Sequence, residues 1–323
     1  MQNILVTGAT GQIGSELTIA LRQQYGEGHV VAAGHRRPPD RALMESGPYC
    51  RLDVRESEAL HQVVRDYHID TIYHLAAVLS AVAERTPQLA WHINMDGLHN
   101  VLEVAREAGC AVFFPSSIGA FGPETPAVQT PQVTIQRPKT MYGITKLAGE
   151  LLCDYYHRRF GVDTRGLRFP GLISSTTPPG GGTTDYAVEI YYAAVQHGHY
   201  ACFLKPETRL DMMYMPDALH AAMALMEADG TRLRHRNAYN VTAMSFAPQD
   251  IAAEIHKALP SFTITYAVDP VRQAIADSWP QSMDDTVARL EWGWRPRFDL
   301  AAMTQDMLAK LAVQCRQTTG DEA

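Results

Sequence analysis

Few cysteines occur in this sequence, and none of them lie at the short spacings that bring thiols together. The 323 residues include 5 cysteines, an odd number, and no C-x-x-C pair. They are widely separated, at Cys50, Cys110, Cys153, Cys202 and Cys315. This pattern argues against a disulfide framework and favours reduced thiols in a cytoplasmic protein. The 13 histidines form no H-E-x-x-H motif, so we expect no metal site.

Long apolar runs and concentrated positive charge are also missing. No apolar stretch reaches the length of a bilayer span, and the opening residues, MQNILVTGATGQIG, lack the basic segment that begins a secretory signal. The formal net charge is -7, and the Lys and Arg residues are scattered. We therefore expect a cytoplasmic protein that has neither nucleic acid nor a membrane as its partner.

What the sequence does contain is an alternation of short apolar runs and helical patterns. The runs are NILVTG, HVVAAG, TIYHLAA and CAVFFPSS, and helical patterns lie near residues 12–25, 56–67 and 95–108. Continuous apolar runs are typical of parallel strands that are buried on both faces. The pattern predicts an α/β fold, with a Rossmann-like doubly wound parallel sheet in residues 1–174 to which some later segments return.

The composition changes after about Ser174. Pro178, Pro179 and three glycines come first, and helical patterns near residues 187–196, 216–227 and 248–258 follow, with one clear strand pattern, FTITYAV. We expect a smaller substrate-binding lobe in residues 175–315. The polar segment 316–323 is expected to fray.

Three glycines directly follow the first predicted strand. Gly8, Gly11 and Gly14 are spaced as G-x-x-G-x-x-G, ahead of a helix that begins with Gln12 and Ile13. Gly8 allows a tight turn, Gly11 lets a pyrophosphate approach the backbone, and Gly14 lets helix and strand pack closely. The free N–H groups at the helix start favour an anion. We predict a dinucleotide site here, with a glycine turn that holds no ligand as the alternative.

A tyrosine and a lysine form the candidate catalytic pair. MYGITK places Tyr142 and Lys146 four residues apart, on one face of a helix. Tyrosine is a poor base because its reference pKa is about 10, but an adjacent ammonium and the positive ring of an oxidised nicotinamide lower that pKa. A surface pair without function is the alternative. Ser117, in FFPSSIGAFG, follows a predicted buried strand and precedes this pair in the chain.

The glycine motif, the serine at the strand end and the Y-x-x-x-K pair together resemble the extended short-chain dehydrogenase/reductase family. The resemblance implies hydride transfer at a carbinol carbon: Tyr142 takes the hydroxyl proton, Ser117 binds the same oxygen, and Lys146 positions the cofactor ribose. It also implies further cofactor contacts, at Asp53 and Val54 in RLDV, Leu75, Ala76 and Ala77 in HLAA, and Leu172. A helix cap is the alternative role for Asp53.

The loop GGGTTD at residues 180–185 is the candidate substrate loop. Its glycines offer a hinge, and Thr183, Thr184 and Asp185 offer two hydroxyls and a carboxylate. A negative Asp185 opposes phosphates and attracts an ammonium, which favours an amino acid over a sugar nucleotide. Capping of the next helix by Thr183 or Thr184 is the alternative, and it is compatible with substrate binding.

The segment from 181 to 194, with KPETRLDMMYMPDALHAAMALMEA downstream, resembles the L-threonine 3-dehydrogenase branch of the family. That resemblance implies oxidation of the β-hydroxyl of L-threonine to 2-amino-3-oxobutyrate with reduction of NAD. It also implies substrate contacts at Ser80 and Thr183. With Ser117, Tyr142 and Asp185, these residues form the expected substrate site. Two alternatives stay open, a sugar-nucleotide epimerase or reductase and a cofactor-sensing regulator without turnover. A homo-oligomer is compatible with the sequence but is not established by it.

The end of the second predicted strand departs from the family pattern. NAD-preferring members usually carry an aspartate there that binds the adenosine ribose, whereas this chain has Gly34, followed by His35, Arg36 and Arg37. The missing carboxylate and the arginines favour the 2′-phosphate of NADP. The resemblance implies NAD, and an arginine can instead stack on adenine. We expect NAD at this site, contacted by Gly34, His35 and Arg36, with weak discrimination against NADP.

Overall fold

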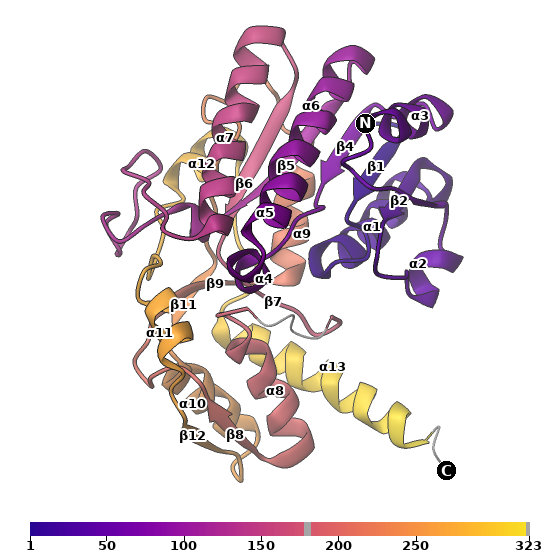
Figure 1. The fold of residues 1–323 in the computed structure, drawn as a ribbon. Helices are drawn as coiled ribbons and strands as arrows, with labels where there is room; N and C mark the ends of the chain where they lie inside the picture. The colour runs from indigo at the N-terminus through magenta and orange to yellow at the C-terminus, as the bar shows by residue number, and fades with distance from the viewer. Residues whose placement is uncertain (178–181, 321–323) are drawn as a thin grey trace.

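A parallel sheet of seven strands forms the centre of the larger part of the molecule (Figure 1). The structure, a computed structural model, describes residues 1–177 and 182–320. The strands lie in the order β10-β6-β5-β4-β1-β2-β3, and all neighbours pair in parallel. Their bounds are β1 Ile4–Thr7, β2 Val30–Gly34, β3 Tyr49–Arg51, β4 Thr71–His74, β5 Ala111–Ser117, β6 Thr164–Phe169 and β10 Tyr239–Asn240. The predicted Rossmann-like fold is confirmed.

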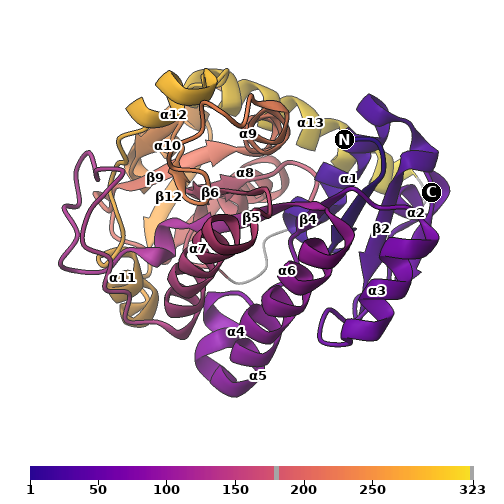
Figure 2. The ribbon, with the colours of Figure 1, turned by 90° about the horizontal axis from the view of Figure 1, so that it is seen from above.

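Helices cover both faces of this sheet because residues of each strand point alternately to two cores. Ile4 and Val6 of β1 enter one core, whereas Leu5 enters the other. Figure 2 shows α3 (Ser57–Asp66), α6 (Gly97–Ala108) and α7 (Met141–Phe160) on one side, with α1 (Gln12–Tyr25) and α9 (Met215–Glu227) on the other. The order of strands reverses between β1 and β4, and ligands of such sheets bind at the carboxyl ends of strands at this point.

The remaining short helical elements connect these layers or lie at their edges. They are η1 Glu27–His29, α2 Arg41–Glu45, α4 Ser80–Arg85, α5 Pro87–Trp91, the π-helical turn η2 His92–Asp96, η3 Ile118–Ala120 and α12 Thr286–Trp292. In the described ranges, no helix combines the length and the apolar character that a bilayer span requires.

A smaller lobe, which contains short strands and four helices, lies below the sheet in Figure 1. Its strands are β7 Gly171–Ile173, β9 Leu210–Tyr214 and β11 Met244–Phe246 in one sheet, and β8 His199–Cys202 with β12 Thr263–Tyr266 in another. Its helices are α8 Tyr186–His197, α10 Pro248–Ala258, α11 Pro270–Ala276 and α13 Leu300–Gly320. Of the strands after residue 175, the sequence predicts only β12. Helix α13 extends to Gly320, into the segment that was expected to fray.

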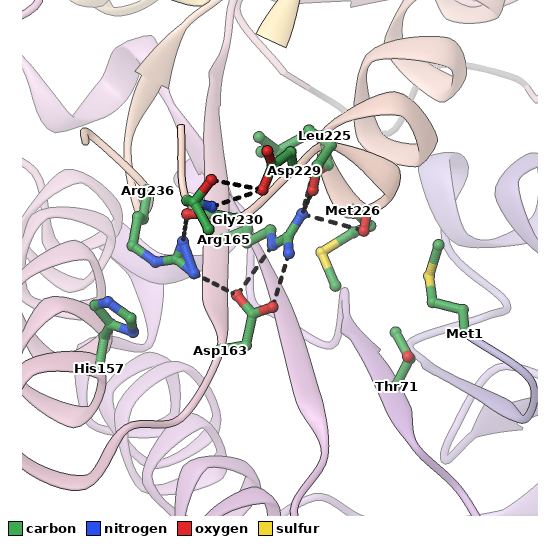
Figure 3. A network of polar contacts seen from close by, with 12 residues as sticks. Met1, Thr71, His157, Asp163, Arg165, Leu225, Met226, Asp229, Gly230 and Arg236 are labelled. Carbon is green, nitrogen blue, oxygen red and sulfur yellow. Dashed lines mark hydrogen bonds and ion pairs between the residues drawn. The ribbon is translucent and has the colours of Figure 1, made fainter. Parts of the chain in front are cut away.

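Two late segments return to the large sheet. β10 pairs with β6 at its edge, and α9 packs against α1. Arg165 of β6 fastens this return (Figure 3): its Nη1 donates to the carbonyls of Leu225, at 2.7 Å, and of Ala228, at 2.7 Å. The guanidinium thereby satisfies carbonyls at the end of α9, and Asp163, bonded to Arg165 at 2.8 Å, balances its charge.

Candidate active site

The glycine-rich turn after β1 leaves no room for a side chain at Gly8 or Gly14. Gly8 has a φ of +69°, and a Cβ atom there would lie 2.6 Å from the backbone nitrogen of Ala76. A Cβ at Gly14 would lie 2.2 Å from the carbonyl oxygen of Gly8. Gly11 is the N-cap residue of α1, and no side chain caps that helix. The turn therefore offers the open N–H groups of α1, beginning at Gln12 and Ile13, to an anion, as a dinucleotide pyrophosphate requires.

The chain after β4 passes directly against this turn. Leu75 and Ala76 are the residues whose backbone touches Gly8, and Leu75 N donates to the carbonyl of Thr7 at 3.0 Å. Ala77 follows them at the same edge of the sheet. The predicted cofactor contacts of β1 and β4 are thus brought together at the point where the strand order reverses.

His74 is the last residue of β4, next to the end of β1. It is buried, and its Nδ1 lies 2.9 Å from the Thr7 hydroxyl oxygen. Burial, with a smaller effect of the Lys146 charge, lowers the pKa of His74 to about 3. The imidazole is therefore neutral at physiological pH and serves to join the ends of β1 and β4.

Ser117 and Tyr142 meet where β5 ends and α7 begins. Thr140 caps α7 by accepting a hydrogen bond from Gly143 N at 3.1 Å. A Cβ at Gly143 would lie 2.1 Å from the carbonyl oxygen of Gly119, so glycine is what permits the helix to approach this turn. A Cβ at Gly119 would in turn lie 3.2 Å from the Tyr142 ring. The tyrosine is thereby pressed against the segment that carries Ser117.

Without a cofactor, the phenol of Tyr142 stays protonated at neutral pH. Burial raises the pKa of Tyr142 to about 12, and a hydrogen bond with Ser117 acts in the opposite direction. Lys146 Nζ lies 5.5 Å from the centre of the tyrosine ring. The expected lowering of the Tyr142 pKa by this lysine does not offset the rise that burial causes. A phenolate at neutral pH therefore needs the further positive charge of an oxidised cofactor.

Lys146 is buried one turn further along α7. Its Nζ donates to the carbonyl oxygen of Pro115 at 2.6 Å and lies 4.9 Å from the centre of the Phe114 ring. Burial lowers the pKa of Lys146 to about 8, whereas nearby Glu150 raises it. The ammonium is therefore fixed against the strand that ends at Ser117.

Asn94 is a buried residue of this site that the sequence did not reveal. It lies in the π-helical turn η2, a distortion that often marks functional positions. Its side chain accepts from Val78 N at 2.7 Å, and donates to Val78 O at 3.1 Å and to Thr145 Oγ1 at 3.0 Å. It thus joins the chain after Ala77 to α7 beside Lys146. The only signal in the sequence was a polar residue within the helical pattern of INMDG.

The described part of the candidate substrate loop folds back on itself. Asp185 is the N-cap residue of α8, and its Oδ2 accepts from Gly182 N at 2.6 Å. Thr183 is buried, and the side chain of Thr184 packs against Gly171 of β7. Asp185 occupies the N-cap position of α8. Neither Thr183 nor Thr184 therefore caps this helix, which was their alternative role. The predicted hinge residues Gly180 and Gly181 lie outside the described residues.

Helix α4 carries Ser80 as its first residue and is fixed to the start of α7. The backbone nitrogen of Met141 donates to Glu84 Oε1 at 2.6 Å. Ser80 is half-buried. The two helices that hold Ser80 and Tyr142 are therefore in direct contact at one side of the site.

The residues predicted near the adenosine surround the ends of β2 and β3. Asp53 accepts from Arg55 Nη2 at 2.6 Å and lies 3.4 Å from His35 Nδ1. The Arg55 hydrogen bond holds the pKa of Asp53 down, at about 2. Val54 is buried against Gly97 of α6, and Arg36 is exposed. Leu172, on β7, pairs with Met213 of β9 and packs against the core that includes Ala9.

Comparison with known proteins agrees with this arrangement. Residues 4–242 match the NAD dependent epimerase/dehydratase family. The chain belongs to this family. An uncharacterized epimerase/dehydratase of Staphylococcus saprophyticus is 54% identical over 95% of this chain and 96% of its own.

Solved structures related to this family member include L-threonine dehydrogenases. The enzyme of Clostridium difficile has a TM-score of 0.96 at 56% identity, covering 97% of this chain and 98% of its own. A GalE-like L-threonine dehydrogenase of Cupriavidus necator, in its holo form, has a TM-score of 0.93 at 51% identity, covering 96% and 99%. The family and these neighbours support an NAD-dependent oxidoreductase.

Proposed function

We propose that this protein oxidises the β-hydroxyl of L-threonine to 2-amino-3-oxobutyrate with NAD as the hydride acceptor. The observation that carries the proposal is the meeting of Ser117, Tyr142 and Lys146 beside the glycine cradle at the carboxyl edge of the sheet. The similarity to L-threonine dehydrogenases across nearly the whole chain supports the choice of substrate.

The chain's own groups divide the work of the reaction. NAD, when bound, supplies the oxidised nicotinamide that accepts the hydride from the substrate Cβ. Tyr142, as phenolate, takes the proton of the hydroxyl, and the Ser117 hydroxyl hydrogen-bonds the same oxygen as it becomes a carbonyl. Lys146 holds positive charge near the ring of Tyr142 and favours its phenolate form. The C–H electron pair leaves with the hydride, and the O–H pair closes the C=O bond.

The loop before α8 supports an amino acid as the substrate. Asp185 contributes negative charge, which attracts an ammonium and repels the diphosphate of a sugar nucleotide. Thr183 and Ser80, which the resemblance assigns to substrate binding, lie on the loop before α8 and at the start of α4, respectively.

The test is a turnover assay that follows NADH absorbance with L-threonine as substrate. The proposal expects NADH to form with L-threonine and not with a UDP-hexose. NADH formation with the sugar nucleotide alone, or interconversion of UDP-hexoses, would indicate an epimerase or reductase instead. NAD binding without turnover of either substrate would indicate a cofactor-sensing regulator.

A further inference from the structure

Gly34 leaves a gap in the cofactor site that another residue fills. It is the last residue of β2, where a carboxylate that binds the adenosine ribose is usual in NAD-binding sheets. A Cβ atom built at Gly34 would lie 2.8 Å from the hydroxyl oxygen of Tyr49 and 2.9 Å from Cγ2 of Thr10. The path that an aspartate side chain would take therefore starts where the Tyr49 hydroxyl already lies.

The fold explains why Tyr49 reaches this point. Tyr49 opens β3, and β3 pairs in parallel with β2 through Ala32 opposite Tyr49 and Gly34 opposite Arg51. The tyrosine side chain must then extend along the sheet to bring its hydroxyl to Gly34. Thr10, the other neighbour of the gap, belongs to the glycine-rich turn. The hydroxyl thus lies between the turn that suits a pyrophosphate and the strand end that suits a ribose.

The surrounding charges favour a neutral hydrogen-bonding group at this position. The nearby carboxylate of Asp53 is already engaged by Arg55 and is close to His35. Burial raises the pKa of Tyr49, so its hydroxyl is protonated at physiological pH and can both donate and accept. A neutral group of this kind binds a ribose hydroxyl but does not repel a 2′-phosphate.

We propose that Tyr49 takes the place of the missing aspartate and is a specificity-determining residue, with its hydroxyl bonded to the 2′-hydroxyl of the adenosine ribose. The inference rests on the proposed function only in requiring a nicotinamide dinucleotide in this site. It adds that the chain recognises the ribose without a carboxylate from β2 and therefore separates NAD from NADP weakly.

The test measures binding by isothermal titration calorimetry, independently of turnover. The probes are NAD and its analogue that lacks the 2′-hydroxyl of the adenosine ribose. We expect the wild type to bind NAD roughly three- to tenfold more tightly than the analogue, as one hydrogen bond provides. Tyr49→Phe should reduce this ratio to about one. Tyr67→Phe, at an exposed tyrosine beyond α3, is the matched control and should keep the wild-type ratio.

The outcomes separate this inference from the proposed function. A Tyr49→Phe variant that keeps the wild-type ratio overturns the role of Tyr49 and leaves the proposed function intact. A wild type that binds NAD and the analogue equally well also overturns the role of Tyr49 and leaves the proposed function intact. Failure of the wild type to bind NAD overturns both proposals.

A second pair of variants, which change Gly34, tests whether the Tyr49 hydroxyl occupies the path of an aspartate side chain. In Gly34→Asp, the new Cβ meets the Tyr49 hydroxyl, so we expect weaker NAD binding than in the wild type. Adding Tyr49→Phe removes the obstructing oxygen, and the double variant should recover NAD binding and disfavour NADP by tenfold or more. A single variant that binds NAD as tightly as the double variant would show that the hydroxyl does not occupy this path.

Discussion

The ammonium of Lys146 and the carbonyl of Pro115 are joined by a hydrogen bond of 2.6 Å, which fastens α7 to the strand that carries Ser117. The lysine is buried, so this carbonyl and the neighbouring aromatic rings replace the water that an ammonium usually keeps. Its charge is thereby held at a fixed place beneath the site.

Lys146→Met should weaken both NAD binding and turnover, because it removes the charge that was assigned to the ribose and to the phenolate. It should not collapse the fold, since methionine fills a similar volume. The measurements are NAD affinity by calorimetry and kcat with L-threonine. A variant that loses turnover but binds NAD as tightly as the wild type would confine the lysine to the proton step.

Tyr142→Phe should lower kcat by about 10²–10⁴-fold, because it removes the general base while keeping the ring. NAD should still bind. Tyr155→Phe, at an exposed tyrosine on the same helix, is the control and should leave kcat unchanged. In the wild type, kcat should rise with pH until the Tyr142 phenol is deprotonated in the NAD complex, where the nicotinamide charge opposes the burial that raises its pKa. Near-normal turnover in the phenylalanine variant would contradict its role.

Gly143→Ala should lower both stability and kcat, because its Cβ would lie 2.1 Å from the Gly119 carbonyl and would push α7 away from the Ser117 turn. A shift of about 1 Å at such a site is costly to turnover. Gly28→Ala is the control, since a Cβ there meets nothing within 4 Å. Thermal unfolding and kcat for both variants make the comparison, and equal behaviour of the two would count against the close approach.

His74 should make the fold sensitive to acid. Its pKa is about 3 in the folded protein and 6.5 in the reference state, so the unfolded chain binds the proton more readily. Stability is then lost as pH falls below about 6.5, by roughly 3 kcal/mol at about pH 4. Urea unfolding of wild type and His74→Gln should show a steeper acid loss in the wild type. Parallel pH profiles would show that the imidazole is not the source.

Thr183→Ala should raise the KM for L-threonine or lower kcat while changing stability little, because Asp185 and not Thr183 is the N-cap of α8. Loss of a helix cap would instead cost about 1 kcal/mol of stability. Thr176→Ala, at an exposed threonine before the loop, provides the comparison. Equal losses of stability and activity would indicate a structural role for Thr183.

The large sheet could be predicted from sequence because its signals are local. Helix α1 was expected at residues 12–25 and has those bounds, since a glycine turn starts it and Gly26 ends it. The small lobe gave weaker signals. β9 reads LDMMY and has no β-branched residue, so its strand comes from burial between β7 and β11 rather than from propensity.

Some residues of the candidate site could be predicted from the sequence, and others could not. Tyr142 and Lys146 could be paired from their helical spacing alone. Asn94 and Tyr49 could not, because their partners are distant in the chain or belong to another strand. Asn94 bonds to Thr145, 51 residues away, and Tyr49 reaches Gly34 only because β2 and β3 pair. Contacts of this kind depend on the register of the finished fold.

Helix α13 also bears on how the polypeptide is made. Met303, Met307 and Leu311 of this helix lie in the core of the smaller lobe, whereas the large sheet gains its last strand at Asn240. A growing chain can therefore assemble all strands of its large sheet while the smaller lobe still lacks part of its interior. Until residue 311 has left the ribosome, the smaller lobe lacks these buried side chains and exposes part of its apolar interior to solvent.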